Sequence, residues 1–271
     1  MLKKIIAVFI NFVCLSVCFG QELFTYTEPA SNMAAKSIGV RINNTLMYDN
    51  FEKENTFHAL PEVMFGLSKN LMMHAEGFLS TRKKALVAEG GAVYLKYRFY
   101  SVDDVHSHFR MAVFARYANN NSEIHQQAID LNGHNSGYEL GCIATKLINK
   151  TALSSSVSLL HADDNAGNNI FNYPSNQRNA VGYTFSVGKL MIPKEYVSYK
   201  QVNMNAMLET LCQTNLETGR TYADVAPVIQ LIFLSRMRAD FSYRLPISKA
   251  LYRTAPEGAL LRFEYNFFNA F

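Results

Sequence analysis

The sequence has few cysteines and no apolar run long enough for a membrane-spanning helix. Of its 4 cysteines, Cys14 and Cys18 lie in an N-terminal apolar stretch, so only Cys142 and Cys212 belong to the remaining chain. Two cysteines form at most one disulfide bond, which is too few to hold a chain of this length together, so a disulfide scaffold is excluded. Polar residues interrupt every later apolar stretch before it reaches the about 20 residues that a transmembrane helix needs.

The chain also lacks an excess of either charge. Its 26 lysines and arginines stand against 22 acidic residues, and Lys3 and Lys4 lie in the N-terminal stretch, which leaves 24 basic residues beyond it. This near-neutral balance argues against a nucleic-acid partner, because such proteins usually show a basic patch. The chain has no linker, low-complexity tract or repeat of fixed period, so we predict a single domain.

The N-terminus has the features of a secretory signal peptide. Lys3 and Lys4 precede a mostly apolar run over residues 5–19, and a small residue follows that run. This order is typical of a cleaved signal, and the run is short for a membrane anchor. We therefore predict a signal peptide at 1–20 and a mature domain at 21–271.

Segments of about ten residues with alternating apolar and polar side chains recur along the rest of the chain. Alternation with a period of two is typical of a β-strand that has one apolar face and one polar face. Such segments occur at residues 37–47, 58–68, 71–81, 89–100, 106–118, 136–148, 151–162, 180–191, 202–214, 222–234, 236–245 and 261–271. They predict an all-β fold of about twelve strands, with ten or fourteen as alternatives, since strand limits are uncertain by a few residues.

Strand length separates a transmembrane barrel from a soluble sandwich. Sandwich strands usually have about five or six residues, whereas many segments here reach ten or more, as a tilted bilayer crossing requires. Short connections alternate with longer polar ones, among them the asparagine-rich stretches 119–135 and 163–179. Short turns on one side and long loops on the other favour an antiparallel up-and-down transmembrane β-barrel.

The last eleven residues, 261–271, alternate in the same way and end on Phe271 without a tail. This ending resembles the C-terminal strand of Gram-negative outer-membrane β-barrels, in which a terminal phenylalanine is the recognition mark for insertion. The resemblance implies that Phe271 is an insertion signal at the periplasmic rim. It also implies an outer-membrane location, with outer-membrane lipids and the barrel-assembly machinery as partners. The Gly20-Gln21 junction is similar to that of many Bacteroidetes exported proteins, and no motif indicates a subfamily.

Charged side chains on the polar faces of these strands must face the lumen, because lipid would exclude them. The lumenal set consists of the bases Arg41, Lys96, Arg98, Arg110, Arg116, Arg236, Arg238, Arg244 and Arg262 and the acids Glu139, Glu209, Asp240 and Glu264. One interpretation is a narrow pore that favours anionic or polar solutes, with a mostly basic constriction formed by Arg41, Lys96, Arg98, Arg110, Arg236, Arg238, Asp240, Arg262 and Glu264. The alternative is a charge network that fills a small lumen for structural reasons.

Two histidine patterns suggest other chemistry. His134 and Ser136 share one face of a strand end, and this His-x-Ser spacing resembles outer-membrane phospholipases and lipid A deacylases. Their motif continues with an asparagine where this chain has Gly137. In the second pattern, His106 and His108 share one strand face, and His74 lies on another strand. The spacing does not fix a third metal ligand beside His106 and His108. We expect neither a metal nor a cofactor.

The sequence therefore predicts a passive outer-membrane channel for small polar or anionic solutes, and no enzymatic activity is expected. Two alternatives remain: a structural or adhesion barrel that acts through its long loops, and a membrane-embedded lipid hydrolase built on His134 and Ser136. We place Cys142 and Cys212 on the lipid side as small apolar residues. No disulfide is expected between them, because their strands are not neighbours.

Overall fold

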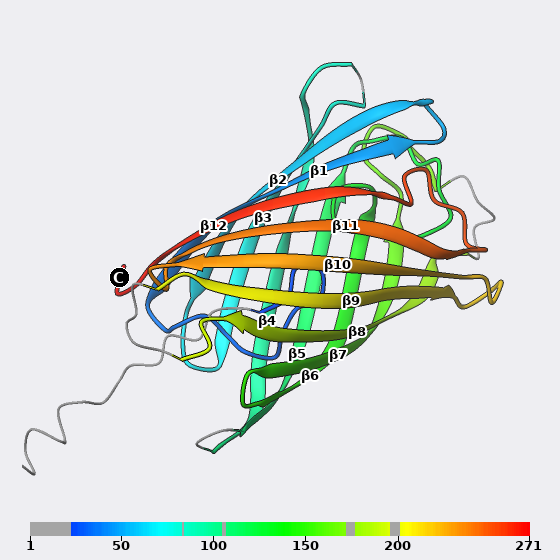
Figure 1. The fold of residues 1–271 in the computed structure, drawn as a ribbon. Coiled ribbons are helices and arrows are strands. Elements are labelled where there is room, and N and C mark those ends of the chain that lie inside the picture. The colour runs from blue at the N-terminus through cyan, green and yellow to red at the C-terminus, as the bar shows by residue number, and fades with distance from the viewer. Residues whose placement is uncertain (1–22, 83, 105–106, 172–176, 196–200) are drawn as a thin grey trace, which may run out of the picture.

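Twelve antiparallel strands close into a barrel, as predicted (Figure 1). The computed structural model describes residues 23–82, 84–104, 107–171, 177–195 and 201–271, so the predicted signal peptide lies outside the described residues. Each strand pairs with the next along the chain, and the last pairs with the first. No described helix is long and apolar enough to cross a membrane.

The strand limits agree with the predicted segments to within a few residues at most ends. The strands are β1 Ser37–Asp49, β2 Glu54–Gly66, β3 Leu71–Ser80, β4 Val87–Asp104, β5 Ser107–Asn120, β6 Ser136–Ile148, β7 Thr151–Asp163, β8 Asn179–Ile192, β9 Asn203–Asn215, β10 Thr221–Phe233, β11 Met237–Lys249 and β12 Gly258–Phe267. Closure leaves no sheet edge, so neighbouring strands satisfy the backbone hydrogen-bonding groups.

The pairing of β1 with β12 shows how the register sorts side chains between the two faces. Val40 lies opposite Tyr265 and both are exposed, whereas Arg41 lies opposite Glu264 and both are buried. Residues directly opposite each other share a face of the sheet. The same alternation around the barrel leaves large apolar side chains exposed outside and polar side chains buried inside. This arrangement is the reverse of a soluble protein and is typical of a barrel in lipid.

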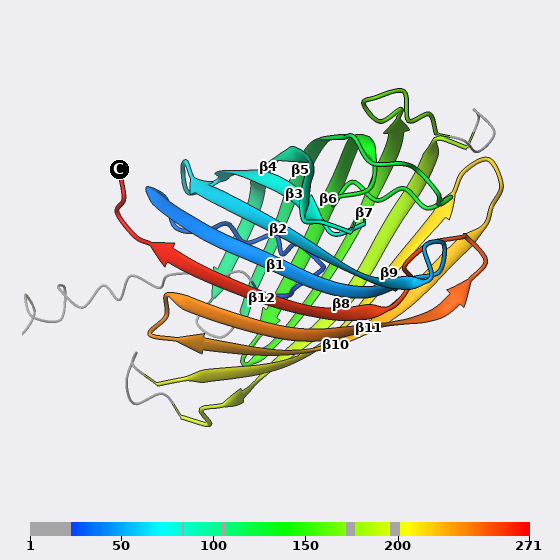
Figure 2. The ribbon, with the colours of Figure 1, turned by 90° about the horizontal axis from the view of Figure 1, so that it is seen from above.

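The connections divide the barrel into two rims (Figure 2). We call the end with the β2–β3, β4–β5, β6–β7, β8–β9 and β10–β11 connections the turn rim, and the opposite end, with the six remaining connections, the loop rim. The chain enters β1 and leaves β12 at the turn rim, where the Ala270 amide donates to the Lys36 carbonyl over 2.8 Å.

Two predicted strand ends are wrong. Residues 101–105 were expected to form a turn, but β4 continues to Asp104 beyond an irregularity in its pairing with β5 between Arg98 and Tyr100. The C-terminal strand ends at Phe267, which pairs with Ile38 near the start of β1. Residues beyond Phe267 have almost no β1 left to pair with, so the chain turns away there.

Two of the described non-strand segments lie inside the barrel. Residues 23–36, here called the N-terminal segment, lie within the ring of strands as the dark blue coil (Figures 1 and 2). Residues 121–135, here called the inward loop, fold back from the loop rim. Ile124, Ile129 and Leu131 of this loop are buried in a cluster with Phe78 and Phe171. The inward loop was expected to extend outside the barrel. It folds into the lumen instead, because its apolar side chains become buried there.

Candidate functional site

The N-terminal segment is bound to the lumen wall through its backbone. The Glu209 carboxylate on β9 accepts hydrogen bonds from three successive amides, those of Thr25, Tyr26 and Thr27, at 2.6, 3.0 and 2.7 Å. Successive amides that converge on one anion form a nest. Phe24, at the start of this bend, has a φ of 68°. The bent backbone therefore brings three donors to one buried acceptor, which is a strong charge-assisted contact.

Two arginines hold the carbonyl groups of the same bend. Arg262 Nη2 donates to the Thr25 carbonyl at 2.5 Å, and Arg238 Nη2 donates to the Phe24 carbonyl. Asp240 accepts a bond from the Thr25 hydroxyl at 3.0 Å and also binds the Arg238 guanidinium. The lumenal charges of β11 and β12 thus satisfy the backbone of the N-terminal segment.

Further contacts hold the segment farther along its length. Lys96 donates to the Pro29 carbonyl at 2.9 Å and pairs with Glu28 at 3.5 Å. Arg110 donates to the Ser31 hydroxyl at 3.0 Å. Contacts to both opposite sides of the barrel fix the segment across the lumen in its turn-rim half.

The inward loop is fixed in the loop-rim half by a second set of backbone contacts. The Gln213 side chain accepts from the Ile129 amide and donates to the Ile129 carbonyl, both at 2.8 Å. The Tyr252 carbonyl accepts from the amides of Gln127 and Ala128 at 3.0 and 3.2 Å. The adhesion alternative relied on two long loops, and the structure places one of them, the inward loop, inside the barrel.

A cavity of about 280 Å³ lies between the N-terminal segment and the inward loop. Tyr26 and Glu28 line it from the segment, and Asp130 and His134 line it from the loop. The wall contributes charged side chains and aromatic rings: Glu62, Glu76, Glu139, Arg116, Arg244, Arg262, Tyr94, Phe114 and Tyr222. The space is polar, small and bounded by two segments that are not part of the sheet.

The lumenal bases are matched by acids, several of which the sequence analysis did not assign. Arg41 lies 2.9 Å from Glu264 and 3.3 Å from Glu62, and Arg116 lies 2.7 Å from Glu76. Glu62 and Glu76 lie on β2 and β3. The sequence analysis did not assign the side chains of these two strands to the lumenal or the outer face, although the alternation within each strand would have allowed it. Asp224 likewise binds Arg244 and Arg253. A wall of ion pairs presents little net charge to a solute.

The structure places the predicted constriction residues in two regions. Seven of them, namely Arg41, Lys96, Arg110, Arg238, Asp240, Arg262 and Glu264, contact the N-terminal segment or the ion pairs around it. Arg98 and Arg236 lie instead at the turn rim. Arg98 donates to the Lys69 carbonyl at 2.7 Å. Arg236 precedes β11 and lies over the Phe268 ring.

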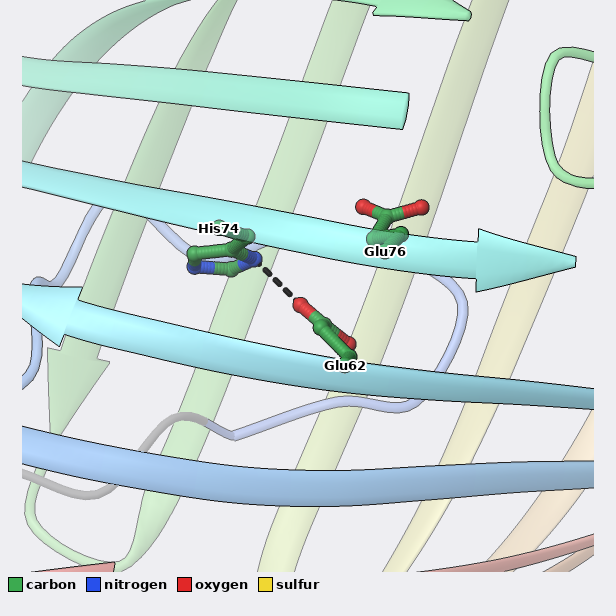
Figure 3. Close-up of side chains that lie close together, drawn as sticks. All are labelled: Glu62, His74 and Glu76. Carbon is green, nitrogen blue, oxygen red and sulfur yellow. Dashed lines mark ion pairs between the residues drawn. The ribbon is translucent and has the colours of Figure 1, made fainter. Parts of the chain in front are cut away.

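Three side chains on β2 and β3 bring together the kinds of ligand atom that a cation site uses (Figure 3). The ligand atoms of Glu62, His74 and Glu76 lie within 4.8 Å of one another, and His74 Nδ1 contacts Glu62. Both carboxylates already bind arginine, through Arg41 and Arg116 respectively. A cation would have to compete with those guanidinium groups, so the geometry fits an ion-pair network.

The His-x-Ser pair does not form a catalytic dyad. The Ser136 hydroxyl accepts from the Asn120 amide at 2.8 Å, and the His134 ring stacks on His58 with centroids 5.2 Å apart. Burial lowers the pKa of His134 well below its usual value, and the nearby Arg82 lowers it further. The imidazole is neutral and packs as part of the inward loop.

The other candidate residues have local roles. His108 lies 2.8 Å from Asp103 at the turn rim, and His106 lies outside the described residues. Cys142 and Cys212 are free, and their strands β6 and β9 are not neighbours. Cys142 is exposed on the outer wall, while Cys212 is half-buried.

No protein-family model and no curated protein sequence matches the chain. Among solved structures, the chain is similar to an outer membrane channel from Pseudomonas putida F1, with a TM-score of 0.56 and 11% identity over 91% of this chain and 100% of that one. It is also similar to the KdgM porin, with a TM-score of 0.50 and 9% identity over 84% of this chain and 99% of that one. At these identities the likeness establishes a shared fold, the closed antiparallel β-barrel.

Proposed function

We propose that the protein is an outer-membrane channel for small polar solutes and that the N-terminal segment gates it. The observation that supports this proposal best is the polar lumen inside an apolar outer wall. A polar interior lowers the barrier for a hydrated solute that crosses the membrane through the barrel. The Gly20-Gln21 junction supports the narrower proposal of a Bacteroidetes origin.

In the described conformation the N-terminal segment lies across the path through the barrel. Its backbone occupies Glu209, Arg238 and Arg262, which project from the wall. Release of the segment would expose these three charged groups together. The open lumen would then contain both signs of charge, so we expect small polar solutes to pass with at most a modest preference for anions.

A reversible disulfide tests the gate. The hydroxyls of Thr27 and Ser186 lie 2.7 Å apart, so the double variant T27C/S186C, made with C142A and C212A, can tie the segment to β8. Single-channel conductance in planar bilayers should be absent in the oxidised protein and appear after reduction. The matched control carries S186C with C142A and C212A and should conduct equally in both states. Absence of conductance in all variants would overturn the channel, and equal conductance of oxidised and reduced protein would overturn the gate.

A further inference from the structure

We infer that the lumen wall from β7 to β12 contains a binding site for a bent peptide, which residues 24–27 occupy and which a separate peptide of the same chemistry can fill. This inference goes beyond solute passage and does not depend on it, because peptide binding can be measured without any ion flow. The site comprises an anion for backbone amides, cations for backbone carbonyls and an apolar pocket.

We call Glu209, Arg238 and Arg262 the backbone clamp. They recognise a peptide by its backbone amides and carbonyls, which almost every residue has. Glu209 takes three consecutive amides, while Arg238 and Arg262 take two consecutive carbonyls. The Glu209 side chain is fully buried. A buried carboxylate requires several donors to compensate for its lost hydration. The segment, or another peptide, supplies these donors to Glu209.

An apolar pocket adds selectivity for an aromatic side chain. The Phe24 ring is 2% exposed and packs with Ala152, Met207 and Val228. A Cβ at Gly188 would lie 3.3 Å from the ring and 2.9 Å from Met207. The glycine therefore keeps room for a large planar group beside the backbone clamp.

Two hydroxyl contacts complete the recognition. Asp240 accepts from the Thr25 hydroxyl at 3.0 Å, and Ser186 lies 2.7 Å from the Thr27 hydroxyl. Together with the apolar pocket, these contacts select an aromatic residue with threonine at the first and third positions after it. The preferred ligand is thus a short peptide with this pattern and a backbone that can bend after its aromatic residue.

The wall groups are positioned by the barrel and not by the peptide. Glu209, Ser186 and Arg262 belong to β9, β8 and β12, whose pairing extends over the whole of each strand. Arg238 is held against Asp240 on its own strand. The tethered segment has an effective concentration in the millimolar range, so a separate peptide competes only after the tethered one is weakened.

The test uses the full chain with F24A/T25P, which removes the aromatic ring and one clamped amide. Calorimetry in detergent should detect binding of a capped peptide with the sequence of residues 21–30. The same peptide N-methylated at Thr25 and Thr27 should bind about 10-fold weaker or more for each amide removed. Locked T27C/S186C should bind neither peptide, since its site is filled.

Matched variants test whether the backbone clamp binds the peptide. In the F24A/T25P chain, E209Q should weaken peptide binding about 10-fold or more, while E217Q, in the exposed turn after β9, should leave it unchanged. If F24A/T25P does not fold, T27P takes its place because it removes a single amide. No binding to a folded variant, or equal binding of the methylated peptide, would overturn the inference. Binding without any conductance would uphold it while overturning the channel.

Discussion

Arg238 and Asp240 lie two residues apart on β11, and the Arg238 Nε atom lies 2.9 and 2.8 Å from the two carboxylate oxygens of Asp240. Both side chains are fully buried. Glu264 adds a second carboxylate at 3.7 Å from Arg238. A buried guanidinium with these partners is stable only while its charge is compensated, so the pair links the barrel wall to the N-terminal segment that both residues bind.

Replacement of Asp240 by asparagine should destabilise the barrel. Arg238 would keep its charge with one fewer carboxylate beside it, and loss of one partner of a buried pair costs about 3–5 kcal/mol. The free energy of unfolding, measured by urea titration in liposomes, should fall by that amount. Asp163→Asn, at an exposed position, is the control and should change it by less than about 0.5 kcal/mol. Equal effects of the two substitutions would contradict the assigned role of Asp240.

Replacement of Phe24 by alanine should open the gate more often. Removal of the buried ring leaves its pocket unfilled, and truncation of a buried phenylalanine costs about 3 kcal/mol. That loss favours the displaced segment by about 100-fold. The open probability in planar bilayers should rise accordingly. Phe185→Ala removes an outward-facing ring of the same size and should leave the open probability unchanged; an equal rise in this control would argue against the pocket.

The inward loop should loosen as the pH falls below the usual pKa of histidine, about 6.5. The folded protein holds His134 neutral with a pKa well below that value, so the unfolded loop binds a proton first. The stability from neutral His134 is therefore present above pH 6.5 and is lost as the pH falls toward the folded pKa. The hydrogen-exchange protection factors of residues 121–135, which are corrected for the intrinsic pH dependence of exchange, should fall between pH 7 and pH 5. His134→Asn should reduce this dependence, and an unchanged dependence would exclude His134 as its source.

Removal of the Phe271 side chain should affect assembly and not stability. Phe271 follows the last strand and is 57% exposed, so its ring contributes little to folded packing. Phe271→Ala should lower the amount of barrel in outer-membrane fractions, while the unfolding free energy of the assembled protein stays within about 0.5 kcal/mol. The control is Phe268→Ala, which removes a nearby ring but keeps the terminal one. Normal amounts of F271A in the outer membrane would show that Phe271 is not the insertion signal.

The strands and their faces could be predicted because each depends on neighbours along the chain. A period of two sorts Val40 and Arg41 to opposite faces wherever the strand lies, and polar side chains cannot face lipid. The twelve strands and most of the lumenal bases follow from this rule. Arg236 was predicted as the first residue of the eleventh strand, but Leu234 and Ser235 adopt positive φ in the turn before it, so β11 begins at Met237.

Contacts across the lumen could not be predicted in this way. Residues 23–36 have no period, and nothing near Thr25 in the chain indicates Glu209, which lies 184 residues away. The same holds for Ile129 and Gln213, 84 residues apart. The sequence by itself determined a barrel with an apolar outside and a charged inside, because alternation is a local property. Only the tertiary structure decided what the charged inside binds, because closure brings together groups that no local pattern relates.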